Sequence, residues 1–423
     1  MRSNFDKVIG YDEVKAELIR ISDVLRSPEK YEKLGVTMPS GVLLFGVPGV
    51  GKTLMVKCFI DESGCKSYTL RKEKPNGDFI NEIKETFEKA KSEAPAIVFL
   101  DDMDKFANED YMHVDAEEYV TVQSCIDNCK GKGVFTIATA NDRYCFPDSL
   151  IRAGRFDKVI EIGVPKGETA KQIIRHYLDR KRVIGDIDVE EISMLMEGKS
   201  CAELETVINE AGICAGFESK EKIDQKDIVR ACMSLMFDSV ESFEKQDSDI
   251  LKKIAIHEAG HAVVAEVLNP GSVSLVTIRR YTGENQGMTK IRSHRCTDYS
   301  FEMQECSAIH YLGGKAATEL IGLEPDMGCE KDLSNAYDIV RRLVQEICSY
   351  GFDSYTTHDS SECFTENRDK RITLEMERLY NRAKKILFKN RDFLNEVIQG
   401  LLDNTTLTYR DMQNIRNRVD IVP

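Results

Sequence analysis

Two histidines stand four residues apart in the segment HEAGH, and Glu258 directly follows the first. On a helix, residues with this spacing project from the same face, so His257 and His261 could bind one zinc ion. Zinc acidifies water, and Glu258 could take a proton from that water and pass it to the leaving amine of a peptide bond. The alternative is a core helix with two hydrogen-bonded histidines. The motif predicts a zinc peptidase site that still lacks a third ligand.

The third ligand has to come from another part of the chain. The segment EPDMGCEKDLSNAYDIVRRL offers three candidates of suitable chemistry, Cys329, Glu330 and Asp332. Spacing alone does not choose among them. The histidines outside the motif are given no metal in this interpretation; they are His113, His176, His294, His310 and His358.

A second chemical motif lies in the first half of the chain, in the segment GVPGVGKT. Gly46, Gly51, Lys52 and Thr53 match the pattern G-x-x-x-x-G-K-[ST], and a short apolar strand is expected before them at 42–45. In this pattern backbone N–H groups surround a phosphate, the lysine contacts the outer phosphates and the hydroxyl contacts Mg²⁺. A glycine-rich turn without function is the alternative. The motif predicts a site for ATP or ADP with Mg²⁺.

Polar residues follow the later strands of this half. Asp101 and Asp102 end a buried apolar strand, which suits magnesium coordination beside a phosphate loop. Asn141 ends the strand VFTIATAN and could orient the water that attacks the terminal phosphate. Arg152 and Arg155 flank a glycine, and as exposed side chains they could act as arginine fingers on a neighbouring subunit. Each arginine taken alone could instead form a surface salt bridge.

These residues need two kinds of scaffold. Strands expected near 41–46, 67–70, 96–101, 134–140 and 158–163 alternate with helical stretches, which predicts an α/β module with a mainly parallel sheet. A mainly α-helical segment carries HEAGH. The predicted domains are a large α/β ATPase subdomain at 1–167, a small helical lid at 168–238, a polar linker at 239–253 and a zinc peptidase domain at 254–423.

Bulk composition argues against several other classes of protein. The chain has a net charge of −14. Nucleic-acid binding needs a basic face, so no nucleic-acid partner is expected. The sequence has no run of about 20 apolar residues that could span a bilayer. The 13 cysteines include no CxxC pair, which indicates reduced thiols. A soluble cytoplasmic protein is the expectation.

Over nearly its whole length the chain resembles the FtsH-type AAA+ zinc metalloproteases, whose peptidase belongs to family M41. The matching motifs occur in the family's order: VIGYDEVKAEL, GVPGVGKT, VFLDDMD, TIATAN, RAGRFD, HEAGH, YLGGKAATELI and the late GFD. The resemblance implies a homo-hexamer with one zinc ion per subunit, which uses ATP to unfold and degrade unfolded or damaged proteins. Family members are anchored in a membrane and face the cytoplasm.

The resemblance also assigns roles to single residues. Asp332 takes the place of the third zinc ligand, while Glu330, in a segment that departs from the family's pattern, stays an alternative or a neighbouring group. Residues 287–291 match an edge strand that pairs with the extended substrate. The nucleotide residues are Ile9 and Gly10 for adenine, Gly46, Val47, Pro48, Gly49, Val50, Gly51, Lys52 and Thr53 for phosphate, Asp101 for Mg²⁺, Asn141 as sensor, and Arg152 and Arg155 as fingers.

Three departures from the family pattern concern the ATPase half. Asp102 stands where the family has a water-polarising glutamate, and slow ATP hydrolysis is expected because a misplaced carboxylate can cost about 100-fold in rate. The pore-loop triplet is Pro75-Asn76-Gly77 instead of aromatic-hydrophobic-glycine, and Phe79 is the nearby candidate to replace the aromatic. The family's transmembrane segments have no counterpart, and the sequence leaves open whether their absence is natural.

The leading interpretation is an ATP-dependent zinc metalloendopeptidase that unfolds and degrades proteins. Two alternatives stay open. The first is an AAA+ chaperone with an inactive peptidase, which the intact HEAGH argues against. The second is a zinc peptidase whose ATPase half is mainly a ring scaffold, which Asp102 and the pore loop favour.

Overall fold

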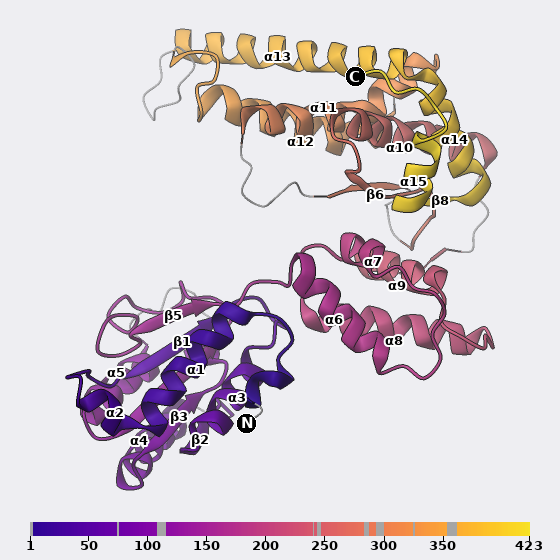
Figure 1. Cartoon of the computed structure of the whole chain (residues 1–423). Helices are drawn as coiled ribbons and strands as arrows, with labels where there is room; N and C mark the ends of the chain where they lie inside the picture. Colours follow the sequence, from indigo (N-terminus) through magenta and orange to yellow (C-terminus); the bar gives the residue numbers. More distant parts are fainter. Residues whose placement is uncertain are drawn as a thin grey trace. The chain divides into compact units, whose positions relative to one another are not determined.

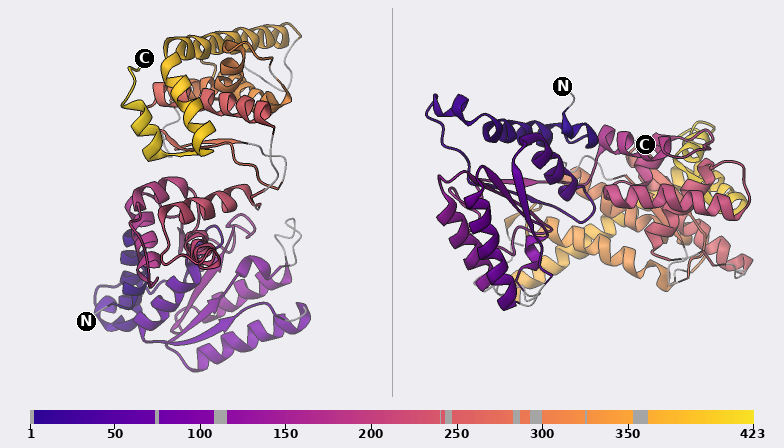
Figure 2. Two further views of the ribbon diagram at one scale, coloured as in Figure 1. Left: turned by 90° about the vertical axis from the view of Figure 1, so that its right-hand side faces the viewer. Right: turned by 90° about the horizontal axis from the view of Figure 1, so that it is seen from below.

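The computed structural model describes residues 3–73, 76–107, 116–239, 241–242, 247–282, 287–292, 300–324, 326–352 and 362–423. Its contacts divide the chain into two compact units. The first comprises Met1–Ile184 and Gly198–Glu210, and the second comprises Gly185–Glu197 and Ala211–Pro423. Figure 1 labels most of the helices and strands, and Figure 2 shows the same ribbon from two other directions.

A five-stranded parallel sheet forms the centre of the first unit, as the sequence predicted. The strands lie in the order β2-β3-β4-β1-β5, and each pairing is parallel. Their bounds are β1 Gly41–Phe45, β2 Lys66–Leu70, β3 Ala96–Leu100, β4 Val134–Ala140 and β5 Lys158–Glu161. Because the carboxyl ends of parallel strands meet at one edge, the loops after β1, β3 and β4 come together there.

Helices cover both faces of this sheet, which explains why its central strands are apolar on both sides. Successive residues of β1 point to opposite faces, so Val42 and Leu44 pack with α1 and α3, whereas Leu43 packs with α4 and α5. The elements around the sheet are η1 Asn4–Lys7, α1 Asp12–Arg26, α2 Pro28–Glu32, α3 Lys52–Ser63, α4 Asn76–Ser92, η2 Met103–Lys105 and α5 Glu117–Cys129.

A helical segment follows β5, where the sequence predicted a lid. Its helices are α6 Gly167–Asp179, α7 Val189–Leu195, α8 Cys201–Phe217 and α9 Gln225–Phe237. The segment after α9 is anchored within the second unit, because the Ser242 N–H donates to Arg280 O at 2.9 Å and Glu241 forms a β-bridge with Tyr281. The bounds predicted for the lid and the linker stay a prediction.

The rest of the second unit is mainly helical, with a small antiparallel sheet of order β7-β6-β8. Its elements are α10 Ser248–Leu268, β6 Val273–Thr277, β7 Met288–Ile291, α11 Phe301–Leu320, η3 Met327–Cys329, α12 Glu330–Gln345, α13 Glu362–Lys389, α14 Arg391–Asn404, β8 Thr406–Thr408 and α15 Tyr409–Arg416. The backbones of α10 and α11 touch, because a Cβ atom on Gly260 would lie 2.4 Å from Gly313 O. This close crossing determines what lies beside the HEAGH helix.

Among the residues that the structure describes, no helix combines the length and the apolar character needed to cross a membrane. The cysteines within the same part of the chain are all free thiols.

Candidate metal and nucleotide sites

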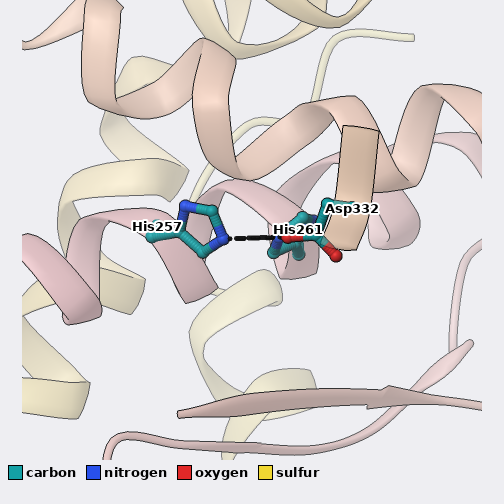
Figure 3. Close-up of side chains that lie close together, drawn as sticks. All are labelled: His257, His261 and Asp332. Atoms are coloured by element: carbon teal, nitrogen blue, oxygen red, sulfur yellow. Dashed lines mark hydrogen bonds and ion pairs between the residues drawn. The ribbon is translucent and has the colours of Figure 1, made fainter. Parts of the chain in front are cut away.

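The two histidines of HEAGH meet Asp332, which lies in the first turn of α12 (Figure 3). Asp332 Oδ2 lies 3.1 Å from His257 Nε2 and 3.2 Å from His261 Nε2, and the two Nε2 atoms are 3.0 Å apart. The other two candidates do not join them. Glu330 is exposed, and the Cys329 thiol donates to Asp326 O at 3.0 Å. The group has the ligand types of a catalytic zinc site with three protein ligands.

A hydrogen bond to the main chain orients one of these imidazoles. His261 Nδ1 lies 2.8 Å from His310 O, so this nitrogen carries the proton and leaves the lone pair of Nε2 facing Asp332. In return, His310 Nδ1 lies 3.1 Å from His261 O. Burial, together with the neighbouring His261, lowers the pKa of His310 to about 3, so His310 is neutral near pH 7. The sequence interpretation gave His310 no role, and the structure places it against the motif.

Gly314 of α11 makes room for both imidazoles. A Cβ atom at this position would lie 2.5 Å from His257 Cε1 and 2.5 Å from His261 Nε2. The two glycines of YLGGKAATEL contribute to the site because they have no side chains. Gly313 lets the two helices approach, and Gly314 leaves space for the histidine rings.

Glu258 is largely buried, with 8% of its surface exposed, and it faces β7. Thr289 Oγ1 lies 2.6 Å from Glu258 Oε2 and 3.0 Å from Glu258 O, so the hydroxyl holds one carboxylate oxygen. A Cβ atom on Gly287 would lie 2.8 Å from Glu258 Oε1. Burial raises the pKa of Glu258, against the effect of the two motif histidines. The predicted edge strand thus forms, at one edge of its sheet, directly beside the expected general base.

A cavity of about 650 Å³ opens above the phosphate-loop motif in the first unit. Most of the predicted nucleotide residues line it; they are Ile9, Pro48, Gly49, Val50, Gly51, Lys52, Thr53, Asp102 and Asn141. Gly10, Gly46, Val47 and Asp101 are not part of the lining. Gly10 instead fits against Thr169, because a Cβ atom there would lie 2.3 Å from Thr169 Cγ2.

Lys52 is fixed by three acceptors at the floor of this cavity. Its Nζ donates to Gly46 O at 2.6 Å, to Val47 O at 3.1 Å and to Asn141 Oδ1 at 3.0 Å. Asn141 Nδ2 in turn donates to Asp104 Oδ2 at 2.9 Å, which fixes the orientation of the amide. Burial lowers the pKa of Lys52, and the nearby carboxylates of the Asp101–Asp104 segment oppose that shift.

Asp101 accepts a hydrogen bond from Thr53, the threonine of the phosphate-loop motif. Its Oδ1 accepts from Thr53 Oγ1 at 3.2 Å and from Thr139 Oγ1 at 2.8 Å. A hydroxyl and a carboxylate side by side are ligand types that suit Mg²⁺. Asp102 follows in the left-handed backbone region, with φ at 52°, and its N–H donates to Thr139 Oγ1 at 3.0 Å.

The two arginines of RAGRFD have different environments. Arg152 is exposed. Arg155 is only 5% exposed, and its Nε and Nη2 donate to the two carboxylate oxygens of Asp127 at 3.2 and 2.6 Å. The expectation that both are exposed is therefore wrong for Arg155, because a paired carboxylate holds it inside its own chain.

Phe79 is also buried, with no exposed surface, and its ring packs edge-to-face on Phe106 with centroids 4.8 Å apart. The suggestion that Phe79 replaces the missing pore-loop aromatic is wrong, since a core side chain cannot grip a substrate. Pro75 lies outside the described residues. Asn76 and Gly77 form the start of α4.

The cavity also contains residues that sequence reasoning missed. One group comes from α6, the residue after it and α8, and its members are Ile173, His176, Tyr177, Arg180, Cys201, Ala202 and Glu205; Lys7, Val8, Tyr11, Leu54, Met55 and Lys105 also line the cavity. The α6 residues recur at helical spacing, so they share one face of the helix. That periodicity in AKQIIRHYLDRK is the signal that could have found them.

Three family models match successive parts of the chain. They are the AAA ATPases ("ATPase family associated with various cellular activities") at residues 42–164, the AAA+ lid domain at 186–230 and peptidase family M41 at 245–415. Curated relatives cover nearly the whole chain. The ATP-dependent zinc metalloprotease FtsH 1 of Thermoanaerobacter sp. (strain X514) is 28% identical over 99% of this chain and 74% of its own length. FtsH of Bacillus subtilis (strain 168) is 28% identical over 99% of this chain and 70% of its own length. FtsH 3 of Petrotoga mobilis is 27% identical, over 98% and 69%.

The order of the three models follows the order of the sites in the structure. The AAA model contains Lys52 and Asn141, and the M41 model contains the cluster of His257, His261 and Asp332. The chain belongs to the FtsH-type AAA+ zinc metalloproteases, with an AAA ATPase module followed by an M41 peptidase domain.

Proposed function

We propose that this protein is an ATP-dependent zinc metalloendopeptidase that unfolds proteins and hydrolyses their peptide bonds at the HEAGH site. One observation carries the proposal: the motif histidines and Asp332, which lies 75 residues after the first of them, converge beside a buried glutamate. The same chain carries a phosphate-loop cavity, which supports coupling to ATP.

The residues present fit a zinc ion. His257 Nε2, His261 Nε2 and Asp332 Oδ2 would hold it, because these three atoms converge and each can offer a lone pair. The main-chain partner of His261 supports this assignment, since a proton on Nδ1 makes Nε2 the nitrogen with the lone pair in the neutral imidazole. Zinc bound there supplies Lewis acidity, which polarises the substrate carbonyl and lowers the pKa of water.

The protein's own groups supply the rest of the chemistry. Glu258 would act as the general base and then return the proton to the leaving amine, and the Thr289 hydroxyl holds its Oε2 and so orients the carboxylate. The strand β7 lies at the edge of its sheet, where it would pair with an extended peptide. An unfolded chain therefore fits the site better than a folded one.

In the ATPase module, Lys52 binds the outer phosphates, and Thr53 and Asp101 would hold Mg²⁺. Asn141 orients the attacking water. Arg152 is the exposed arginine that would reach a neighbouring subunit, and a homo-hexamer is the assembly in which each subunit meets such a neighbour.

A second function is favoured by specific observations: a zinc peptidase whose ATPase module is mainly a ring scaffold. Asp102 is shorter than the glutamate of the family pattern, so ATP hydrolysis lacks the usual water-polarising group. Phe79 is buried in the core, so substrate translocation lacks the usual pore-loop aromatic. A chaperone with an inactive peptidase has less support, because the metal-ligand types and Glu258 are all in place.

The test compares wild type with Lys52→Ala and Glu258→Gln in degradation of an unfolded protein, with and without a zinc chelator. Loss of degradation in both variants and with the chelator supports the proposal. Loss only with Glu258→Gln and the chelator favours the scaffold function. If neither the wild type nor a variant cleaves a peptide although zinc is bound, the proposed peptidase activity is wrong. Asp332→Ala should lower the zinc content, whereas Glu330→Ala, a matched loss of an exposed carboxylate, should leave it unchanged.

A further inference from the structure

A second ammonium group lies in the nucleotide cavity, on a residue that the sequence interpretation did not single out. Lys105, at the end of η2, lines the cavity together with Lys52 and Asp102. Its Nζ lies 2.9 Å from Asp102 Oδ2, and Arg71 Nη2 lies 3.5 Å from the same oxygen. The carboxylate that stands in place of the water-polarising glutamate is thus held by cations of its own chain.

The two lysines differ in how firmly they are held. Lys52 is buried and bound by three acceptors, so its ammonium cannot move far. The Lys105 side chain is 61% exposed, and it forms its ion pair with Asp102 at the cavity wall. The hydrogen bond with Asp102 raises the pKa of Lys105, so this group is cationic at neutral pH. Lys105 can therefore exchange its partner at little cost.

A phosphate in the cavity would compete for this lysine. Lys105 and Lys52 line the same cavity, so a phosphate bound there would meet both ammonium groups. Two neighbouring cations in one cavity favour a highly charged anion, and a terminal phosphate carries more negative charge than one carboxylate. Arg71 stays beside Asp102, so the carboxylate keeps a counter-ion if Lys105 leaves.

We propose that Lys105 is a specificity-determining residue for ATP: it pairs with Asp102 in the absence of ATP and transfers to the terminal phosphate when ATP binds, which removes the lysine from Asp102 Oδ2. This inference rests on the proposed ATP site. The ion pair between Lys105 and Asp102 would then exist only without ATP, and with ATP bound Asp102 Oδ2 would keep only Arg71 beside it. It also separates ATP from ADP, which lacks the terminal phosphate.

The test measures binding of ADP and of a non-hydrolysable ATP analogue, each with Mg²⁺, by calorimetry. Lys105→Met should weaken binding of the analogue about tenfold, the size of one charge-assisted hydrogen bond, and leave ADP binding within about twofold. Lys105→Arg should keep the preference for the analogue. Lys57→Met, which removes an exposed lysine elsewhere on α3, is the matched control and should change neither affinity.

Equal weakening for both nucleotides, or no weakening, overturns the inference. Retained ADP binding reports that the variant is folded. Wild-type protein that binds neither nucleotide overturns the proposed ATP site itself, a result that differs from both of these.

A double-mutant cycle tests the exchange of partners. Asp102→Asn removes the competitor for Lys105, so it should tighten binding of the ATP analogue more in the wild-type background than in Lys105→Met. The same tightening in both backgrounds would mean that Asp102 acts only through its charge, and the exchange would be wrong.

Discussion

Gly314 leaves no room for a side chain beside His261, because a Cβ atom added to it would lie 2.5 Å from His261 Nε2. The same atom would lie 2.5 Å from His257 Cε1. Both rings therefore pack against a helix that is far from them in sequence, and the proposed metal site depends on a residue that has no functional group.

Gly314→Ala should displace both imidazoles, so zinc affinity should fall about 10- to 100-fold, as for other groups that orient metal ligands. Zinc content and peptide cleavage are the measurements, and ATP binding should persist. Gly216→Ala is the control, because a Cβ atom added to that helical glycine of α8 would meet nothing within 4 Å, so the methyl group should be tolerated. Full zinc content in Gly314→Ala would contradict the geometry.

Thr289→Val removes the hydroxyl that holds Glu258 Oε2 while keeping the shape of the side chain. The general base should lose its orientation, so kcat for peptide cleavage should fall about tenfold or more, with KM little changed. Zinc content should stay at the wild-type level, which separates this effect from loss of the metal. Thr289→Ser keeps the donor and should restore most of the rate; if serine is as slow as valine, packing rather than the hydrogen bond is responsible.

Asp102→Glu lengthens the carboxylate by one methylene and should bring it closer to the terminal phosphate. ATP turnover should rise, by up to about 100-fold if distance is the limiting factor. Steady-state ATPase rates measure the change, and ADP affinity serves as the control for an intact cavity. Unchanged turnover would show that the shorter side chain is not what slows hydrolysis.

Arg416→Ala should destabilise the peptidase domain by about 3 kcal/mol, because it leaves a buried carboxylate without its cation. Glu266 has no exposed surface, and its Oε2 lies 3.0 Å from Arg416 Nη1. Backbone N–H groups of Gly271 and Val273 also donate to Glu266, which limits the loss. Denaturant unfolding measures the effect, with the exposed Arg418→Ala as the matched control; equal stability of the two variants would refute it.

Two errors in the sequence interpretation have the same origin. Arg155 and Phe79 stand in motifs where an exposed side chain was expected, yet Arg155 pairs with Asp127 and Phe79 packs on Phe106. In each case the partner lies more than 25 residues away in the sequence. Burial at such positions depends on which distant segment packs there, and a local motif carries no information about it.

Chemistry that is local to one helix or strand could be predicted from the amino-acid sequence. HEAGH places two imidazoles on one helix face because of the helical repeat, and GVPGVGKT after an apolar strand specifies a phosphate loop. The alternation of strands and helices likewise predicted the parallel sheet, since connections in such folds are short and regular.

The distant groups that complete the sites could be identified only from the packing of the folded chain. From the residues alone, Cys329, Glu330 and Asp332 were equal candidates, and the close crossing of α10 and α11 with the start of α12 beside them brings Asp332 to the histidines. The same packing placed His310 and Thr289 against the motif, and the meeting of parallel strand ends placed Lys105 in the nucleotide cavity. Local periodicity determines which face of an element is buried, whereas the neighbours across that face depend on how the whole core packs.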